Sequence, residues 1–454
     1  MAEQIMQETA GKAIPAGYKQ TEVGVIPEDW KVKSGEEITV LIGKGASPRW
    51  QGFSYTSDGM LFVTSENVRD GYLDISEPKY LPLEFHEKLK RSQLQIGDIL
   101  INLVGASIGR SCYIDIELGE ANINQAVSVF RLSDEYNARF ISCYFSSSIC
   151  IGRILDMQVD AARPNISLGD LRRFLIPLPP SAEQTAIANV LSDSDAVIDA
   201  LEQLIAKKQA VKSATMQQLM TGHTRLPAFA LRPDGTPKGY KPSELGEIPE
   251  DWAVCEMGTL GFTYGGLTGK SKKDFGHGNG LYVPFTNVMA NIIVDIAKLE
   301  KVHVAENQND VINGDLLFNG SSETPEEVCF CSLVNHDVSG LYLNSFCFGF
   351  RRKDGAQYIP IYLSYWFRSS IGRKAVSIMA QGSTRYNISK KQFLQLSITL
   401  PSIEEQTAIA TILSDMDNEL QALTQKLEKA RALKQGMMQQ LLTGRIRLPL
   451  EVVA

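Results

Sequence analysis

The sequence predicts an α+β protein built from a duplicated unit, in which a globular part is followed by one long helix. Three observations predict this fold. The segment 17–32 returns at 239–254 with 11 identities in 16 positions, and the same offset of 222 relates 179–227 to 401–449. Short β-rich runs broken by Gly, Ser and Asn mark the globular parts. About 40 residues of helical pattern follow each of them. Two copies with so long a period indicate a domain duplication rather than a solenoid.

The repeat divides the 454 residues into seven segments. We expect a linker rich in turn-forming and polar residues, which is typical of a surface connection. Each globular segment is long enough to bury a core of its own. The expected segments are an N-terminal tail (1–16), a first globular domain (17–178), a first spacer helix (179–222), a linker (223–238), a second globular domain (239–400), a second spacer helix (401–444) and a C-terminal tail (445–454).

Within the globular parts, the runs 60–64 and 99–102 predict strands, and the segments 140–145 and 362–367 predict helices. We expect mainly antiparallel sheets. Short echoes survive between the two copies, including Gly97-Asp98 against Gly314-Asp315. The echoed pairs Asn165-x-Ser167 and Asn387-x-Ser389 predict helix caps and scaffold positions rather than base readers.

The long helices have recognisable ends. Ser181-x-x-Gln184 after two prolines predicts a capping box, and Ser402-x-x-Glu405 is its counterpart. Gly222 and Gly444 predict the stops. The helix between such limits is about 60 Å long at 1.5 Å per residue.

An apolar seam runs along each helix in steps of four and three, and two similar seams in one chain predict that the helices pair as a coiled coil. In the first helix, Lys208 and Lys212 interrupt the seam. The expected seam positions are Ile198, Leu201, Ile205, Leu219, Met416, Leu420, Leu423, Leu427, Met437 and Leu441.

Composition excludes several classes. With 45 basic and 52 acidic residues the formal charge is −7, which argues against a protein coated with positive charge for indiscriminate binding to DNA or membranes, although a local basic face stays open. No apolar run reaches 18 residues, and we expect no secretion signal at the start. Seven scattered cysteines favour buried free thiols in a reducing cytosol, without a structural metal.

Enzyme motifs are missing. The loop from Gly265 to Ser271 resembles a phosphate loop, but Tyr264 stands where that motif needs glycine. The acid pairs Glu28-Asp29 and Glu250-Asp251 are interpreted as solvated turn residues rather than a general acid and base. We identify no catalytic centre.

Basic residues gather in the second copy. The stretch 351–391 contains nine basic residues against one acidic residue, with five Tyr or Trp side chains interleaved, and Lys270–Lys273 adds a second cluster. Such a stretch is typical of phosphate binding, but it equally fits a solvated face with aromatic residues in the core. The equivalent stretch 131–173 has six basic and five acidic residues.

The helix starts Glu183-Gln184-Thr-Ala-Ile-Ala188 and Glu405-Gln406-Thr-Ala-Ile-Ala410, the Gln-Gln-Leu-x-Thr-Gly ends and the Gly-Asp pairs occur in duplicated order. In these motifs the chain resembles the specificity (S) subunits of bacterial and archaeal type I restriction-modification enzymes. The resemblance covers residues 17–449, nearly the whole chain.

This resemblance implies two target recognition domains, each reading one half of an asymmetric bipartite DNA site in the major groove. It implies that the helices form an antiparallel coiled coil that sets the gap between the half-sites. Two methyltransferase (M) subunits would carry S-adenosylmethionine and methylate adenine, and two restriction (R) subunits would use ATP and Mg. The chain itself would be non-catalytic, without a cofactor, and cytoplasmic. Alternatives are a coiled-coil adaptor whose heads bind proteins and an enzyme with an unrecognised site.

The resemblance transfers no base-reading residues, so candidates are chosen by chemistry at predicted loops and strand ends. We also expect the subunit alone to bind DNA weakly. The candidates in the first domain are Lys44, Ser47, Arg49, Gln51, Thr64, Ser65, Asn67, Asn102, Arg110 and Arg163; those in the second are Thr268, Lys270, Ser271, Lys272, Thr286, Asn287, Asn319, Ser321, Ser322 and Arg385.

Overall fold

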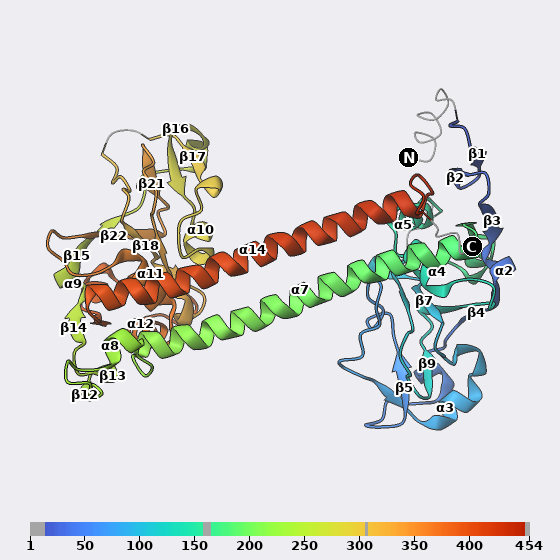
Figure 1. Ribbon diagram of the computed structural model, residues 1–454, viewed down its shortest axis with the longest axis horizontal. Coiled ribbons are helices and arrows are strands. Elements are labelled where there is room, and N and C mark those ends of the chain that lie inside the picture. Colours follow the sequence, from blue (N-terminus) through green and yellow to red (C-terminus); the bar gives the residue numbers. More distant parts are fainter. Residues whose placement is uncertain (1–13, 158–164, 305–306, 450–454) are drawn as a thin grey trace. The chain divides into compact units, whose positions relative to one another are not determined.

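The computed structural model describes residues 14–157, 165–304 and 307–449 (Figure 1). The chain divides into two compact units. Unit 1 comprises residues 1–202 and 425–454, and unit 2 comprises residues 203–424. Each unit contains one globular head and part of each long helix. We call residues 14–178 head 1 and residues 239–400 head 2.

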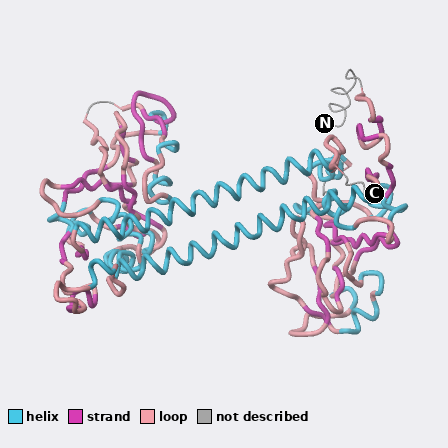
Figure 2. Tube along the Cα trace, viewed as in Figure 1, coloured by secondary structure: helices cyan, strands magenta, loops and turns pink. Residues whose placement is uncertain are grey.

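Head 1 mixes strands, helices and loops (Figure 2). Its central sheet is antiparallel in the order β4-β10-β7-β8, formed by β4 (Thr39–Lys44), β10 (Val127–Leu132), β7 (Ile99–Asn102) and β8 (Ser111–Tyr113). A second sheet has the order β6-β5-β9, in which β5 (Met60–Val63) pairs antiparallel with β6 (Tyr80–Leu81) and parallel with β9 (Ala121–Ile123). The other elements are β1 (Tyr18–Thr21), β2 (Gly24–Pro27), β3 (Lys31–Ser34), α2 (Gly35–Ile38), η1 (Arg49–Gln51), α3 (Leu83–Lys88), η2 (Lys90–Ser92), η3 (Gly105–Ser107), α4 (Ala138–Phe145), α5 (Ser148–Asp156), α6 (Leu168–Arg173) and β11 (Leu175–Leu178).

Head 2 has the same topology. Its central sheet has the order β15-β22-β18-β20, formed by β15 (Gly261–Gly265), β22 (Cys347–Arg352), β18 (Leu316–Asn319) and β20 (Cys331–Leu333). In the second sheet, β16 (Phe275–Val283) lies between β17 (Glu300–Val302) and the parallel strand β21 (Leu341–Leu343). The other elements are β12 (Tyr240–Ser243), β13 (Gly246–Pro249), β14 (Ala253–Glu256), α9 (Met257–Leu260), η4 (Lys272–Asp274), α10 (Phe285–Ala290), η5 (Ile296–Lys298), β19 (Ser321–Ser322), η6 (Pro325–Glu327), α11 (Pro360–Arg368), α12 (Ser370–Met379), β23 (Tyr386–Asn387), α13 (Lys390–Leu394) and β24 (Ser397–Leu400).

These elements confirm the predicted α+β class, the duplication and the mainly antiparallel sheets. The predicted strands are β5 and β7, and the predicted helices are α4 and α11. Ser167 and Ser389 cap α6 and α13 through capping boxes, as predicted. The asparagines of the same motifs do not cap these helices. Asn165 forms an isolated antiparallel β-bridge with Val104, and Asn387 lies in strand β23.

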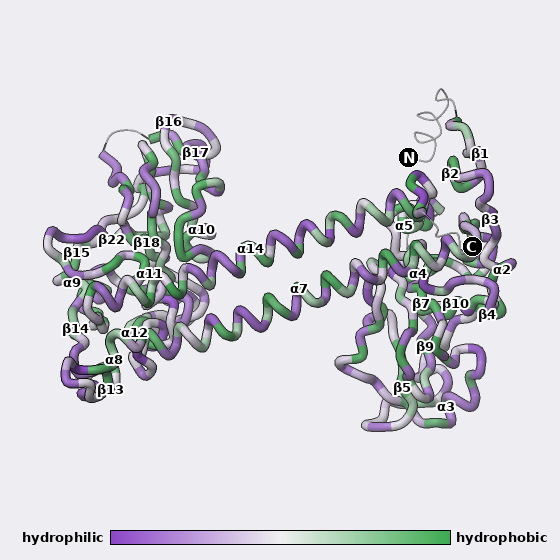
Figure 3. The backbone as a smooth tube through the Cα atoms, in the orientation of Figure 1, coloured by the Kyte–Doolittle hydropathy of each residue, from purple (hydrophilic) through white to green (hydrophobic). Residues whose placement is uncertain are grey.

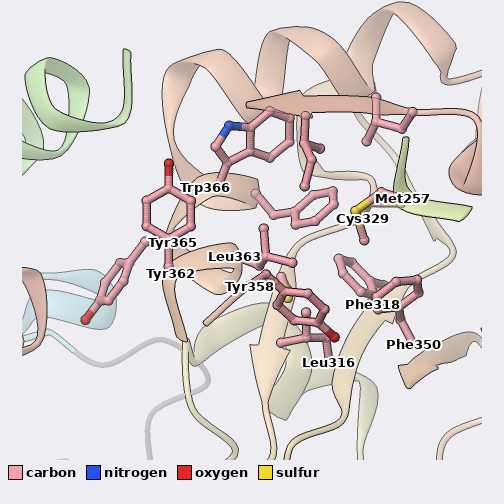
Figure 4. Close-up of a cluster of buried hydrophobic side chains, with 14 of the residues drawn as sticks. Met257, Leu316, Phe318, Cys329, Phe350, Tyr358, Tyr362, Leu363, Tyr365 and Trp366 are labelled. Atoms are coloured by element: carbon pink, nitrogen blue, oxygen red, sulfur yellow. The ribbon is translucent and has the colours of Figure 1, made fainter. Parts of the chain in front are cut away.

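The aromatic residues of 351–391 lie mainly in the core of head 2. Tyr358, Tyr362, Tyr365 and Trp366 are at most 1% exposed, and Figure 4 shows them packed in the same buried cluster as Phe318. This resolves the alternative left open by the sequence, because buried rings cannot stack on nucleic acid.

The Gly-Asp echoes are structural. Asp98 and Asp315 are buried carboxylates that directly precede β7 and β18. Each accepts paired hydrogen bonds from an arginine on the neighbouring strand of the same sheet, Arg131 at 2.7 and 2.8 Å and Arg351 at 3.0 and 2.8 Å. A buried carboxylate needs such a partner, so both residues of the pair survive duplication.

The long helices α7 (Ser181–Thr221) and α14 (Ile403–Leu441) run antiparallel, as expected. In unit 1, Lys434 and Arg431 of α14 pair with Asp195 and Glu202 of α7. In unit 2, Lys208 and Lys212 of α7 pair with Glu419 and Asp417 of α14. In each unit the residue number rises along one helix as it falls along the other.

The seam residues face inward. Hydrophobic and hydrophilic segments alternate along both helices in Figure 3. Ile198, Leu219, Leu423, Leu427 and Leu441 are buried. The half-buried positions are Leu201, Ile205, Met416, Leu420 and Met437. Lys208 and Lys212 interrupt the apolar pattern because their amines reach acids on the opposite helix.

Both predicted stops are confirmed, since Gly222 and Gly444 adopt φ of +71° and +68° at the helix ends. The capping-box prediction is wrong for the first helix. Ser181 is already helical, and Gln184 donates from Nε2 to the Pro179 carbonyl instead of reaching back to the cap. For the second helix only the serine half holds, because Ser402 Oγ accepts from the Glu405 N–H.

The carboxylate of Glu405 instead holds head 2 to both helices. Glu405 is 2% exposed and accepts from Trp252 Nε1 at 3.1 Å and from Arg225, which follows α7, at 2.7 Å. Arg225 also pairs with Asp251 at 2.8 Å. Burial disfavours the charged form of Asp251, but hydrogen bonds from Arg225 and Lys238 outweigh it and lower the pKa to about 2.

Unit 1 repeats the arrangement. Glu183, at the start of α7, is 1% exposed and accepts from Trp30 Nε1 at 3.1 Å and from Arg447, which follows α14, at 2.7 Å. Arg447 also pairs with Asp29. We call these two groups the head–helix junctions. Asp29 and Asp251 are exposed turn residues, as expected, and the structure adds that both form ion pairs with the junction arginines.

A repeated tyrosine and a repeated glycine also contribute to each junction. Tyr18 donates its hydroxyl to the carbonyl of Gly444, and Tyr240 donates to that of Gly222. A Cβ at either glycine would lie 2.5 Å from the ring of Pro27 or Pro249. The linker, which contains α8 (Pro227–Ala230), is therefore more than a surface connection, because the Arg225 side chain is only 7% exposed.

Removing the arginine of a junction tests its contribution to stability. We expect Arg225→Ala to destabilise unit 2 by about 3–5 kcal/mol, because it leaves the buried Glu405 carboxylate without its charge partner. Arg232→Ala is the matched control, since Arg232 pairs with Glu250 at the surface, where a pair contributes at most about 1 kcal/mol. Calorimetry of the full chain measures both; equal losses would contradict a special role for the junction.

Charge reversal tests the pairing of the helices. Lys434→Asp should lower the stability of unit 1 by about 1 kcal/mol, because it sets two carboxylates against each other, and adding Asp195→Lys should restore most of the loss. Lys429→Asp, at an exposed position of the same helix, serves as control. A double variant no more stable than the single one would argue against this pair.

Candidate nucleic-acid interface

In each head, a loop leaves the first strand of the central sheet and passes close to the second sheet. A Cβ at Gly45, after β4, would lie 1.6 Å from the carbonyl oxygen of Ile123. A Cβ at Gly266, after β15, would lie 2.1 Å from that of Asn344. No larger residue fits such an approach, so glycine determines where both loops leave the sheet.

Head 1 gathers basic side chains around this loop. We call Lys44, Arg49, Lys88, Lys90 and Arg91 basic surface 1; all five are exposed. The loop and the α3–η2 segment touch, because Lys88 Nζ donates to the Gln51 carbonyl at 3.3 Å and lies 5.5 Å from the Phe53 ring centre. The Arg91 carbonyl lies against Gly43 of β4.

The charges of basic surface 1 are available to a ligand. Within the part of the chain that the structure describes, none of its five side chains forms an ion pair. Glu84 and Glu87 on α3 are the acids closest to it in sequence. By contrast, Arg69, Lys79 and Arg110 of head 1 pair with acids.

Head 2 has a corresponding group, basic surface 2, formed by Lys270, Lys272, Lys273, Lys301 and His303. Lys270 Nζ donates to the His303 carbonyl at 2.7 Å. The loop is held by Asp274, which accepts from the Ser271 N–H and whose own carbonyl accepts from the His303 N–H. Hydrogen bonds from the Ser271 backbone and side chain lower the pKa of Asp274.

Much of the basic stretch 351–391 serves the fold. Arg368 donates to carbonyls of Val288, Met289, Asn291 and Cys331. Arg373 donates to carbonyls of the 326–329 turn. Burial lowers the pKa of Arg373 to about 10. Counting charges along the sequence therefore overestimates the basic face here.

Arg385, the DNA-contact candidate within 351–391, has an exposed side chain. Its Nε donates to Ser321 Oγ at 3.2 Å, and its guanidinium lies 5.4 Å from the ring centre of Phe346, which is 58% exposed. The exposed lysines 390 and 391 follow on α13.

The candidate residues separate by burial. Thirteen have at least partly exposed side chains: Lys44, Ser47, Arg49, Gln51, Ser65, Asn67, Arg110, Thr268, Lys270, Ser271, Lys272, Thr286 and Arg385. Six are buried: Thr64, Asn102, Asn287, Asn319, Ser321 and Ser322. Arg163 lies outside the described residues.

The buried candidates are occupied by internal bonds. Asn102 Nδ2 donates to the Ser65 carbonyl, and Asn319 Nδ2 donates to the carbonyls of Ser321 and Glu327. Asn287 holds the segment before η5 through Asp295. Half-buried Asn67 closes a turn on Thr64 in the same way. The structure gives these residues a scaffold role and gives no support to a base-reading one.

Sequence reasoning missed Lys88, Lys90 and Arg91 of basic surface 1 and Lys301 and His303 of basic surface 2. The run Lys88-Leu-Lys-Arg91 was a visible signal, but its distance of more than 35 residues from the loop concealed the association. Lys301 and His303 reach the loop through the pairing of β16 with β17.

Comparison with known proteins identifies the family. The model of the type I restriction modification DNA specificity domain matches residues 27–212 and 277–431. The chain belongs to this family. It is thus a DNA-recognition subunit of a type I restriction-modification system, and the family's specificity subunits are not catalytic.

Individual relatives agree over nearly the full length. The chain is 25% identical to a protein of Methanocaldococcus jannaschii named as the MjaX type I restriction enzyme specificity subunit, over 95% of this chain and 97% of that one. It is 22% identical to the EcoKI specificity subunit of Escherichia coli K12, over 93% and 90%. A solved chain from a type I R-M system, reported for its complex assembly and conformational transition, matches with a TM-score of 0.56 at 15% identity, over 93% and 99%.

The described residues offer neither a metal site nor a membrane-spanning helix. Across residues 14–157, 165–304 and 307–449, three or more His, Cys, Asp or Glu side chains never gather as a metal site would require. In that same part of the chain, no helix combines the length and apolarity needed to cross a membrane.

Basic surface 1 leads to a quantitative prediction. Lys90→Ala with Arg91→Ala should weaken DNA binding by the complex with its methyltransferase and make the salt dependence shallower by up to about 1 in log–log slope per lost phosphate contact. Lys31→Ala, on the separate β3–β11 pair, removes an exposed charge of head 1 as control. Titrations at several salt concentrations measure the slope; an unchanged slope would remove basic surface 1 from the interface.

Proposed function

We propose that each head reads one half of a bipartite DNA site with the loop that follows its first central strand, β4 or β15, placed in the major groove. The supporting observation is the basic surface found at the same topological position in both heads. Lysine and arginine there neutralise phosphates, while loop side chains such as Ser47, Gln51, Thr268 and Ser271 offer donors and acceptors to base edges.

The divergence of these loops supports the proposal. The segments 17–32 and 239–254, which carry the junction tryptophans, share 11 of 16 residues, whereas 44–51 and 265–274 share little sequence. A molecule that reads two different half-sites needs one repeated scaffold and two different reading surfaces. A coiled-coil adaptor with protein-binding heads would not require unpaired basic side chains at matched loops.

We further infer the partners. Two methyltransferase subunits carrying S-adenosylmethionine would supply adenine methylation, and two restriction subunits using ATP and Mg would supply translocation and cleavage. The solved relative from a type I R-M complex assembly supports such partners. The methyltransferase subunits would flip the target base, because a base inside the stack cannot be reached. Such a complex works on DNA in the cytoplasm of a bacterium or archaeon.

Head replacement tests the reading of half-sites. A chain in which residues 239–400 are replaced by 17–178 keeps an equivalent junction at each position, because Trp30 and Trp252 bind equivalent glutamates. We expect the methylated site to become two inverted copies of one half-site, and the converse replacement to give two copies of the other. Methylation-sensitive sequencing of host DNA reads the result; an unchanged methylated sequence in both chimaeras would contradict the proposal.

A further inference from the structure

Head 1 exposes one tryptophan at the centre of its reading loop. Trp50 is 88% exposed, whereas Trp30, Trp252 and Trp366 are at most 1% exposed. Within the described residues, the Trp50 ring makes no aromatic or cation–π contact. An exposed tryptophan forgoes a large gain from burial, so its position calls for a ligand surface.

The backbone under Trp50 is firmly held. The residue lies in η1, where Gln51 N–H and Phe53 N–H both donate to the Pro48 carbonyl, at 2.9 and 3.0 Å. Gly52 turns the chain with φ of +85°, and the Phe53 ring packs edge-on against buried Phe85. The indole is thus presented by an ordered turn, which reduces the entropy lost when it binds.

The surroundings of Trp50 specify the partner. Arg49 is its neighbour in sequence, and Lys88 donates to the Gln51 carbonyl on its other side. These belong to basic surface 1, whose described members form no ion pair. An apolar ring amid unpaired cations matches the DNA duplex, in which phosphates border the apolar faces and methyl groups of the bases.

We propose that Trp50 enters a DNA groove and makes the apolar contact of head 1 with the bases of its half-site. This inference rests on the proposed function and deepens it. The two heads differ in this respect, because the matched loop 265–274 carries Lys270-Ser-Lys-Lys273 and no aromatic residue before Phe275. Head 1 reads with an aromatic contact, and the corresponding loop of head 2 reads with polar and charged groups alone.

Affinity measurements on the complex of the full chain with its methyltransferase subunits test the proposal. Trp50→Ala should weaken binding to a duplex carrying the methylated sequence between about fivefold and a hundredfold, the range typical of aromatic contacts with bases. Trp50→Phe should keep most of the affinity. The salt slope should not change, because tryptophan neutralises no phosphate. Base substitutions should lose discrimination in one half-site only.

Tyr72→Ala is the matched control. Tyr72 is also an exposed aromatic residue of head 1, at 60%, but its turn lies beside ion-paired Arg69 and Arg110. We expect no change in affinity for this variant.

Fluorescence gives an independent readout. Acrylamide should quench the emission of Trp50 selectively in the full chain, because the other three tryptophans are buried. The emission of Trp50 in the complex is obtained by subtracting the Trp50→Phe signal from that of the wild type. Adding the cognate duplex should reduce the quenching of this emission by acrylamide. Unchanged affinity and selectivity of Trp50→Ala, or an unprotected Trp50, would overturn the inference while leaving the proposed function intact. A wild-type complex that does not prefer its methylated sequence over a scrambled duplex would overturn both.

Discussion

The structure depends on the hydrogen bonds accepted by a buried glutamate at the start of each long helix. Glu183 and Glu405 each accept hydrogen bonds from a tryptophan of a head and from an arginine that follows the other long helix. A carboxylate removed from water is costly unless every partner is in place. Head, helix start and opposite helix end are therefore stabilised only together, which explains why these separated motifs survive in both copies.

This dependence separates two kinds of residue in the chain. Trp, Glu, Arg and Asp of the junctions, the Asp98–Arg131 and Asp315–Arg351 pairs and the Lys–Asp pairs of the helices maintain the scaffold. The loops after β4 and β15 contribute no buried ion pair to the scaffold, and their close approach to the second sheet requires only one glycine each, Gly45 and Gly266. They are free to diverge, and a family that discriminates between DNA sequences needs variation at such positions.

The net charge of −7 acquires a different meaning in this light. Acids such as Asp98, Asp315, Glu183 and Glu405 are buried and paired with arginine, so they present little negative potential to an approaching ligand. Arginines such as Arg368 and Arg373 likewise donate their hydrogen bonds to backbone carbonyl groups inside head 2. A phosphate backbone meets the basic side chains that form no ion pair, and in each head several of these lie near the loop after the first central strand.

The sequence by itself determined the duplication, the α+β class, the pairing of two long helices and the family resemblance, because each rests on periodicity or repeated motifs that are local in the chain. It misassigned the role of Gln184, gave no sign of the ion pairs of Asp29 and Asp251, and left the aromatic residues of 351–391 undecided between surface and core. Only the tertiary structure decided these cases, together with the makeup of basic surface 1 and the exposure of Trp50. The physical reason is that burial and ion pairing depend on neighbours distant in sequence, such as Arg447 beside Asp29 or Lys88 beside Gln51.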